Sequence, residues 1–102
     1  MDYKIVWSDR SLIHLEGIVY FIGEDNPSAA RKMGENIFHK VSLLAQFPRL
    51  GKVYGELNRD DVREIPAPPF RIFYQIMDAD KAISILAVWH GARQEPEALL
   101  GL

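Results

Sequence analysis

The sequence contains no cysteine among its 102 residues. This absence excludes a disulfide framework, a catalytic thiol and a thiolate metal site, and it is typical of proteins that fold in a reducing compartment. No basic segment leads into an apolar one at the N-terminus, so we expect no signal peptide. No apolar run approaches the roughly 20 residues of a membrane-spanning helix. We therefore expect a cytoplasmic protein that does not contact a membrane.

The sequence also lacks the motifs of several enzyme classes. It has no glycine-rich phosphate loop, no nucleophile elbow and no HExxH spacing of metal ligands. His14 and His39 fall in separate predicted helices without a set of acidic companions, so we interpret both as surface or packing residues. The sequence therefore predicts no metal site and no cofactor.

A strong excess of charge of one sign is absent too. Twelve Lys and Arg residues against fourteen Asp and Glu residues give a net charge of −2 and a pI near 5.9. This balance argues against a surface built for strong nonspecific nucleic-acid binding, but it does not exclude a local basic cleft. The length and the apolar content of 48% fit one compact domain over residues 1–102.

Two helices are predicted after a short strand at residues 3–7. Ser8 suits the N-cap of the first helix, which we expect over about residues 9–23. Asn26 as N-cap and Pro27 as first helical residue start the second helix, because proline loses nothing where no amide bond is made. The link between the helices is short, so we expect an antiparallel helical hairpin.

The first predicted helix is apolar over more than one face. Ile13, Tyr20 and Phe21 lie largely outside the stripe that helical spacing assigns to the core. Burial between a sheet and the second helix is one interpretation, and contact with a partner chain is the other. The predicted core stripe consists of Leu12, Leu15, Val19 and Ile22.

The C-terminal third contains the most strand-like residues of the chain, after an irregular stretch at residues 48–61. Pro66 is expected to end the first of three strands, and the polar turn Asp78–Lys81 joins the other two. The predicted element order is therefore β-α-α-β-β-β, an α+β fold. The three strands span residues 62–65, 70–77 and 82–90.

If Met77 opposes Ala82 across this turn, alternation assigns each side chain of the hairpin to one face of the sheet. A slip by one residue would exchange the faces of one strand. The proline-rich link leaves the register of the preceding strand unfixed, so the face of Arg63 stays open. One face carries Arg71, Phe73, Gln75, Ser84, Leu86, Val88 and His90. The other, expected to pack on the helices, carries Phe70, Ile72, Tyr74, Ile76, Ile83, Ile85, Ala87 and Trp89.

Four basic residues near these strands are candidates for chemistry. His90 could act as a general acid or base near neutral pH, and Arg93 could bind a phosphate through two hydrogen bonds. Arg63 and Arg71 are candidate phosphate ligands on the same grounds. For all four, a structural role or a surface ion pair is the alternative interpretation.

Three motifs stand out beside the element order. NPSAA opens the second helix, FPRLG follows it, and VREIPAPPFRIFYQIMDADKAISILAVWHGAR covers residues 62–93. Together they resemble the RelE/ParE superfamily of toxins from bacterial type II toxin–antitoxin modules, often described as plasmid-stabilisation proteins. The resemblance covers nearly the whole chain. It implies a twisted, mainly antiparallel sheet with an antiparallel helical hairpin packed on one face.

The resemblance also implies a partner. Such a toxin inhibits growth until a cognate antitoxin wraps it with its C-terminal segment. We expect the antitoxin on the surplus apolar faces of the two helices and on the open face of the sheet. The expected contact residues are Ile13, Tyr20, Phe21, Phe38, Phe73 and Leu86.

Two activities occur in the superfamily, and the residues favour one of them. RelE-like members cut mRNA at the ribosome; under that alternative Arg63, Arg71, His90 and Arg93 would surround the scissile phosphate. However, Ile65 stands where that branch has a second basic residue, and residues 94–102 hold no aromatic residue to match its C-terminal tyrosine. ParE-like members lack this catalytic set, and characterised ones poison DNA gyrase. We therefore expect a ParE-like toxin that is not a nuclease; an mRNA endonuclease and an inactive antitoxin-binding paralogue are the alternatives.

Overall fold

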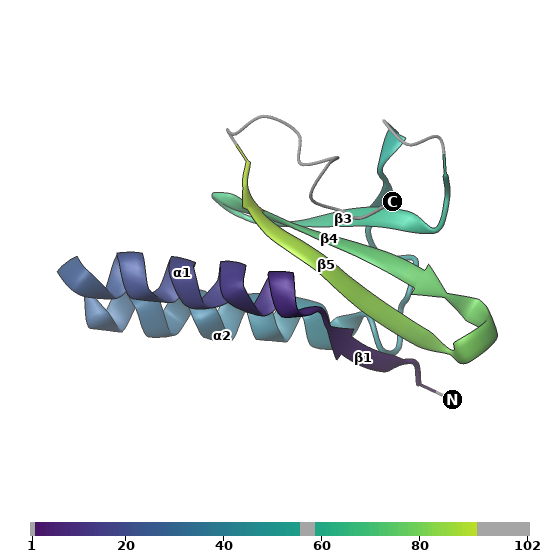
Figure 1. Ribbon diagram of the computed structural model, residues 1–102, viewed down its shortest axis with the longest axis horizontal. Helices are drawn as coiled ribbons and strands as arrows, with labels where there is room; N and C mark the ends of the chain where they lie inside the picture. The colour runs from purple at the N-terminus through teal and green to yellow at the C-terminus, as the bar shows by residue number, and fades with distance from the viewer. Residues whose placement is uncertain (1, 56–58, 92–102) are drawn as a thin grey trace.

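The computed structural model describes residues 2–55 and 59–91 of the chain. Two helices lie side by side against one face of a five-stranded twisted sheet, so the α+β architecture is confirmed (Figure 1). The structure adds a two-residue strand within the predicted irregular stretch, too short to leave a pattern in the sequence. It also places a 3-10 turn over Asp78–Asp80, inside the predicted polar turn. The elements are β1 (Lys4–Trp7), α1 (Asp9–Asp25), α2 (Pro27–Leu43), β2 (Lys52–Val53), β3 (Val62–Ala67), β4 (Phe70–Met77) and β5 (Ala82–His90).

The sheet has the strand order β1-β5-β4-β3-β2. The first strand pairs in parallel with the last one, and every other neighbouring pair is antiparallel. The helical hairpin forms the crossover from β1 back to the sheet and covers one face of it (Figure 1). Among the described residues, no helix is long and apolar enough to cross a membrane.

Both helices begin directly after the predicted N-cap residues, Ser8 and Asn26. The Ser8 side chain accepts a hydrogen bond from the Ser11 amide, and the Asn26 side chain accepts one from the Ala29 amide, each at 3.0 Å. These bonds satisfy first-turn amides that have no partner within the helix. Pro27 takes the first position of α2, as expected.

The main core lies between the helices and the sheet, and a smaller cluster lies on the sheet's other face. Burying one such aliphatic or aromatic side chain contributes roughly 1.5–3 kcal/mol, so the larger cluster supplies most of the driving force for folding. Its buried members are Leu15, Ile37, Val41, Leu44, Ile65, Ala67, Ile72, Tyr74, Ile76, Ile83, Ile85 and Val88. The smaller cluster contains Tyr54, Val62, Phe73 and Ala87.

A β-bulge at Leu86 changes the register of the β4–β5 hairpin. Near the turn the predicted pairing is confirmed, with Met77 opposite Ala82. Further along, Tyr74 pairs with Ile85 but Phe73 pairs with Ala87, which leaves Leu86 as one extra residue on β5.

The bulge reverses the alternation of β5 beyond Leu86, so four predicted faces are wrong. Ala87 and Trp89 belong to the smaller cluster rather than to the helix side. Val88 belongs to the main core, and His90 pairs with Phe70, which packs against that core.

The strand β3 runs to Ala67, so the prediction that Pro66 would end it is wrong. Pro66 pairs with Arg71 on β4. On the other side of β3, the short β2 pairs only with Arg63 and Glu64, so β3 is an edge strand at Pro66. A proline is tolerated there because an edge strand needs hydrogen bonds on one side only.

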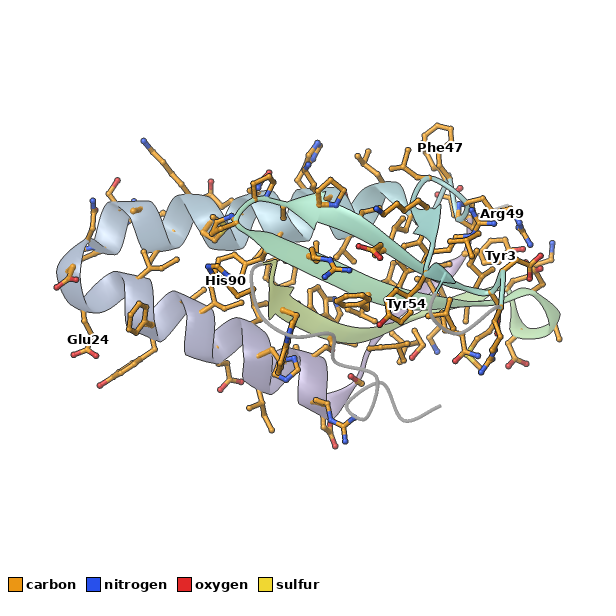
Figure 2. All side chains as sticks on the ribbon, turned by 90° about the horizontal axis from the view of Figure 1, so that it is seen from above. Tyr3, Glu24, Phe47, Arg49, Tyr54 and His90 are labelled. Atoms are coloured by element: carbon orange, nitrogen blue, oxygen red, sulfur yellow. The ribbon has the colours of Figure 1, made fainter. Side chains whose placement is uncertain are left out.

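The side chain of Tyr74 holds the segment that follows α2 in place through two hydrogen bonds. The buried hydroxyl of Tyr74 accepts a hydrogen bond from the Gly51 amide at 2.9 Å and donates one to the Pro48 carbonyl at 2.8 Å. A Cβ atom at Gly51 would lie 2.7 Å from both this hydroxyl and the Glu64 carbonyl oxygen, so the packing requires glycine. Figure 2 shows Phe47 and Arg49 of this segment at the end of the molecule away from Glu24.

Candidate functional site

Arg71 lies on the face of β4 away from the helices. Its Nε donates to Glu64 Oε1 at 2.8 Å, and the centre of its guanidinium lies 4.9 Å from the centroid of the Phe73 ring. Glu64 is 7% exposed, and a carboxylate buried to that extent is costly unless a cation pairs with it. Arg71 therefore binds a carboxylate of the same chain, whereas the nuclease hypothesis requires it to bind a phosphate.

Arg63 lies on the opposite face from Arg71. It pairs with Tyr74, whose side chain packs on the helix side of the sheet. Its guanidinium donates to the backbone carbonyls of Asp60 and Gly51, each at 3.0 Å. These bonds connect the start of β3 to the segment after α2, so the contacts of Arg63 are structural.

His90 faces α1 because of the bulge. Its ring meets the Phe70 ring edge-on, with centroids 5.6 Å apart. Phe70 and Arg71 are consecutive residues of one strand and therefore point to opposite faces. The predicted grouping of Arg71 with His90 on one face is wrong, and Arg93 lies outside the described residues.

A second ion pair lies just before β3 and is joined to the sheet by Gln75. Arg59 donates to both carboxylate oxygens of Asp61, at 2.9 and 2.6 Å, and Gln75 Nε2 donates to the same carboxylate at 2.9 Å. The bond from Arg59 is the main reason that the pKa of Asp61 lies below its ordinary value. Within residues 2–55 and 59–91, no three His, Asp or Glu side chains are arranged to hold a metal ion.

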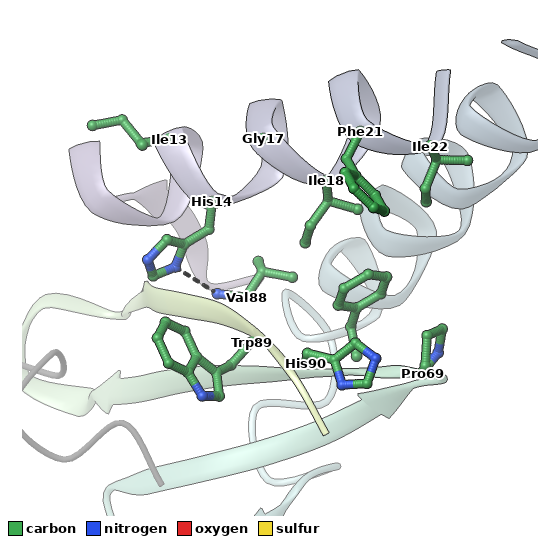
Figure 3. A pocket seen from close by; sticks show the side chains of 11 residues that line it. Ile13, His14, Gly17, Ile18, Phe21, Ile22, Pro69, Val88, Trp89 and His90 are labelled. Carbon is green, nitrogen blue, oxygen red and sulfur yellow. Dashed lines mark hydrogen bonds between the residues drawn. The ribbon is translucent and has the colours of Figure 1, made fainter. Parts of the chain in front are cut away.

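An apolar groove of about 590 Å³ lies between α1 and the end of β5 (Figure 3). None of its lining side chains carries a fixed charge. In Figure 3, Ile18 and Phe21 project from α1 on one side, and His90 and Pro69 lie on the sheet side. The lining residues are Ile13, His14, Gly17, Ile18, Phe21, Ile22, Pro69, Phe70, Val88, Trp89 and His90.

His14 joins the helix wall of this groove to the sheet wall. Its Nδ1 accepts a hydrogen bond from the Val88 amide at 3.2 Å (Figure 3, dashed line). This amide points away from β4, along the part of β5 that extends past β1. Burial, and next the charge of Arg10, lower the pKa of His14. The neutral imidazole that accepts this bond is therefore the favoured form.

Four of the six predicted antitoxin-contact residues are exposed on the helical hairpin. The exposed fractions are 67% for Ile13, 71% for Tyr20, 77% for Phe21 and 51% for Phe38. The other two predicted contacts lie on the sheet. Phe73 is fully buried beneath Tyr54, with ring centroids 5.3 Å apart, and Leu86 is half-buried against the same cluster.

Phe73 therefore has no surface for a partner to touch in this structure, contrary to the expectation of an open sheet face. Its burial results from the segment around Tyr54, which packs down on that face. Sequence reasoning also missed the groove and the Glu64 partner of Arg71. The acidic residue stands beside Arg63 in the sequence, but its position diagonally across from Arg71 depends on a strand register that the proline-rich link conceals.

Comparison with known proteins gives a consistent result. A family model described as the ParE toxin of the type II toxin–antitoxin system parDE matches residues 5–95. The chain is 31% identical over 90 residues to the toxin RelE2 of Caulobacter vibrioides, covering 88% of this chain and 97% of that toxin.

Two solved structures share the fold. The chromosomal ParDE system from P. aeruginosa matches with a TM-score of 0.71 and 21% identity, over 86% of this chain and 95% of that one. A mutant of the E. coli toxin RelE in complex with the antitoxin peptide RelBc matches with a TM-score of 0.62 and 20% identity, over 96% of this chain and 93% of that one.

Proposed function

The chain belongs to the ParE toxin family of type II toxin–antitoxin systems, within the RelE/ParE superfamily, and we propose that it inhibits growth by binding a protein target rather than by cutting RNA. DNA gyrase is the proposed target, by analogy with characterised ParE-like toxins. One observation carries the choice of mechanism. Arg71 and His90, the two candidates that a nuclease would need together, occupy opposite faces of the sheet.

A ribonuclease of this kind needs a cation on the scissile phosphate and a proton-transfer group within hydrogen-bond reach of the same nucleotide. Here the cation of Arg71 is paired with a buried carboxylate, and the imidazole of His90 faces an apolar groove. Arg63 donates to backbone carbonyls on the side opposite to Arg71. These three side chains therefore do not converge on one phosphate.

We also propose that the cognate antitoxin covers the exposed apolar side chains of the helical hairpin. Ile13, Tyr20, Phe21 and Phe38 leave a large apolar area in contact with solvent, which is typical of a surface that binds another protein. The antitoxin peptide bound to the E. coli relative supports a partner that acts through a short segment.

Two assays on the purified toxin test this function. Incubated with DNA gyrase, plasmid and ATP, the toxin is expected to inhibit supercoiling or to accumulate cleaved plasmid. In a translating extract, it is expected to leave the mRNA intact. Growth arrest after induction without antitoxin should persist in the His90→Gln variant, since this residue has no catalytic role in the proposal.

The assays also identify the alternatives. Cleavage of mRNA by the wild-type toxin that is lost in Arg71→Lys or His90→Gln would establish the endonuclease instead. Normal growth after induction, with the folded protein present and still binding antitoxin, would establish an inactive paralogue. Growth arrest without any effect on gyrase would retain a non-nuclease toxin but reject gyrase as its target.

A further inference from the structure

The side chain of His14 forms a connection between α1 and the sheet that no other residue of this helix provides. Within residues 2–55 and 59–91, the bond from the Val88 amide to His14 Nδ1 is the one hydrogen bond that joins a residue of α1 to a strand. Ser8, just before α1, anchors its start, because the Ser8 amide donates to the Ile85 carbonyl at 3.1 Å. Beyond His14, α1 continues past the end of β5 (Figure 1).

This hydrogen bond requires a neutral ring. The neutral imidazole has one acceptor nitrogen, whereas the protonated ring donates from both nitrogens and accepts from none. No strand supplies a replacement acceptor for the Val88 amide, because this amide points away from β4 and the pairing of β1 ends with Trp7 opposite Ile85. One proton on His14 therefore removes the polar connection between the two walls of the groove.

The charged and titratable groups around the ring do not favour its protonation. On α1, Arg10 lies one turn before His14, and its positive charge repels a proton on the ring. On β5, the titratable neighbour in the groove is His90, and on the side of β4 the lining residues Pro69 and Phe70 are uncharged. Among the described lining residues there is no carboxylate to stabilise an imidazolium. The proton therefore favours an arrangement in which the ring gains access to water.

We propose that His14 is a proton-operated latch: the neutral ring joins α1 to the end of β5, and protonation releases the Val88 amide and lets the two walls of the groove separate. The open form carries a positive charge on the helix wall, where the closed form has none. The groove thus changes its width and its electrostatic character in one titration. This inference rests on contacts within the chain and is independent of the proposed function.

Amide hydrogen exchange of the whole wild-type chain, followed by NMR, tests the latch. The released ring titrates near pH 6.5 and the closed ring at a lower pH, so linkage raises the opening equilibrium by about 3- to 10-fold between pH 7.5 and pH 5.5. The protection factor of the Val88 amide should fall by that amount, once the intrinsic pH dependence of exchange is removed. The amide of Tyr74, a fully buried residue of the central strand, is the reference for global unfolding and should lose less protection.

Two variants separate His14 from the other imidazole of the groove. His14→Asn carries an acceptor oxygen at the same branch point as Nδ1 but does not titrate, so the protection factor of the Val88 amide should change little between the two pH values. His90→Gln is the matched control, because it removes the second imidazole of the groove and should keep the wild-type response. A titration of the wild-type protein needs no variant: the Val88 amide resonance should shift with the same midpoint as the His14 ring.

Four results would overturn the inference. The first is a Val88 amide resonance that does not move while the His14 ring titrates. The second is an equal loss of protection at Val88 and Tyr74, which would mean that the proton acts on global stability alone. The third is the full wild-type response in a folded His14→Asn variant. The fourth is loss of the response in His90→Gln, which would assign the titration to the other imidazole.

Discussion

Arg71 and Glu64 form an ion pair between neighbouring strands, with Nε and Oε1 separated by 2.8 Å and the glutamate 7% exposed. The pair lies against Phe73, which is fully buried. Glu64 is nearly excluded from water while Arg71 stays partly exposed, so removal of the arginine would leave the carboxylate with neither a cation nor its hydration. An arginine that could be taken for a phosphate ligand is thereby part of the fold.

The Arg71→Ala variant is expected to lose about 2–4 kcal/mol of unfolding free energy, because it leaves the Glu64 carboxylate buried without a cation. Urea denaturation at pH 7 measures the loss. The double variant Arg71→Met with Glu64→Leu should recover most of the stability, since apolar residues of similar size leave no charge to desolvate. An Arg71→Ala variant that unfolds at the wild-type urea midpoint would contradict this role.

Removing the Tyr74 hydroxyl should loosen the segment after α2. Tyr74→Phe leaves the Gly51 amide and the Pro48 carbonyl without their buried partner, at a cost of about 1–3 kcal/mol. Chemical denaturation measures the cost, and hydrogen exchange should show faster exchange of the Gly51 amide. Tyr20→Phe is the matched control, because Tyr20 is exposed on α1 and its hydroxyl should contribute little.

Protonation of His14 should lower the free energy of unfolding as the pH falls. Its folded-state pKa lies below the unfolded value of about 6.5, so on acidification the unfolded state binds the proton first. The contribution is fully present above pH 6.5 and is lost as the pH falls from there through the lower folded value. Protonation also removes the acceptor for the Val88 amide.

Urea midpoints from pH 8 to pH 5, compared between wild type and His14→Gln, isolate this contribution from those of the carboxylates. The wild-type midpoint should fall more steeply below pH 6.5. Titration of the His14 ring by NMR should give a midpoint below 6.5 in the folded protein. A midpoint at or above that value would contradict the burial of a neutral imidazole.

Truncating Phe21 should weaken antitoxin binding without affecting the fold. Phe21 is 77% exposed, so Phe21→Ala removes little buried area from the free protein. A central aromatic contact typically contributes about 2 kcal/mol or more, so affinity should fall about 30-fold. Phe47→Ala is the control, because Phe47 is exposed at the end of the molecule away from the helical link (Figure 2). Equal affinities for both variants would place the antitoxin elsewhere.

Local chemistry explains why the elements could be predicted from the sequence. Ser8 and Asn26 carry cap oxygens, and Pro27 fixes a helical first residue, so each helix start depends on side chains at that start rather than on tertiary structure. The polar turn between Met77 and Ala82 likewise fixes the register at one end of the hairpin.

Which side chains share a face of the sheet near its functional residues depends on strand register and packing, which the sequence pattern does not reveal. The strand Ala82–His90 is apolar at both odd and even positions, so no polar residue marks the extra residue at Leu86. The pairing of Glu64 with Arg71 follows from the β3–β4 register, and the groove is a space between elements distant in the chain. Neither leaves a periodic signal.

The extra residue at Leu86 sets which face of the sheet His90 occupies. Regular alternation from the turn would place the imidazole on the face that carries Arg71, whereas the bulge brings it opposite Phe70 and toward α1. Deleting the extra residue would remove the bulge and leave the histidine opposite Phe70. The bulge therefore lets the last strand change its length by one residue while the histidine stays in the α1 groove, as long as its pairing with Phe70 is kept.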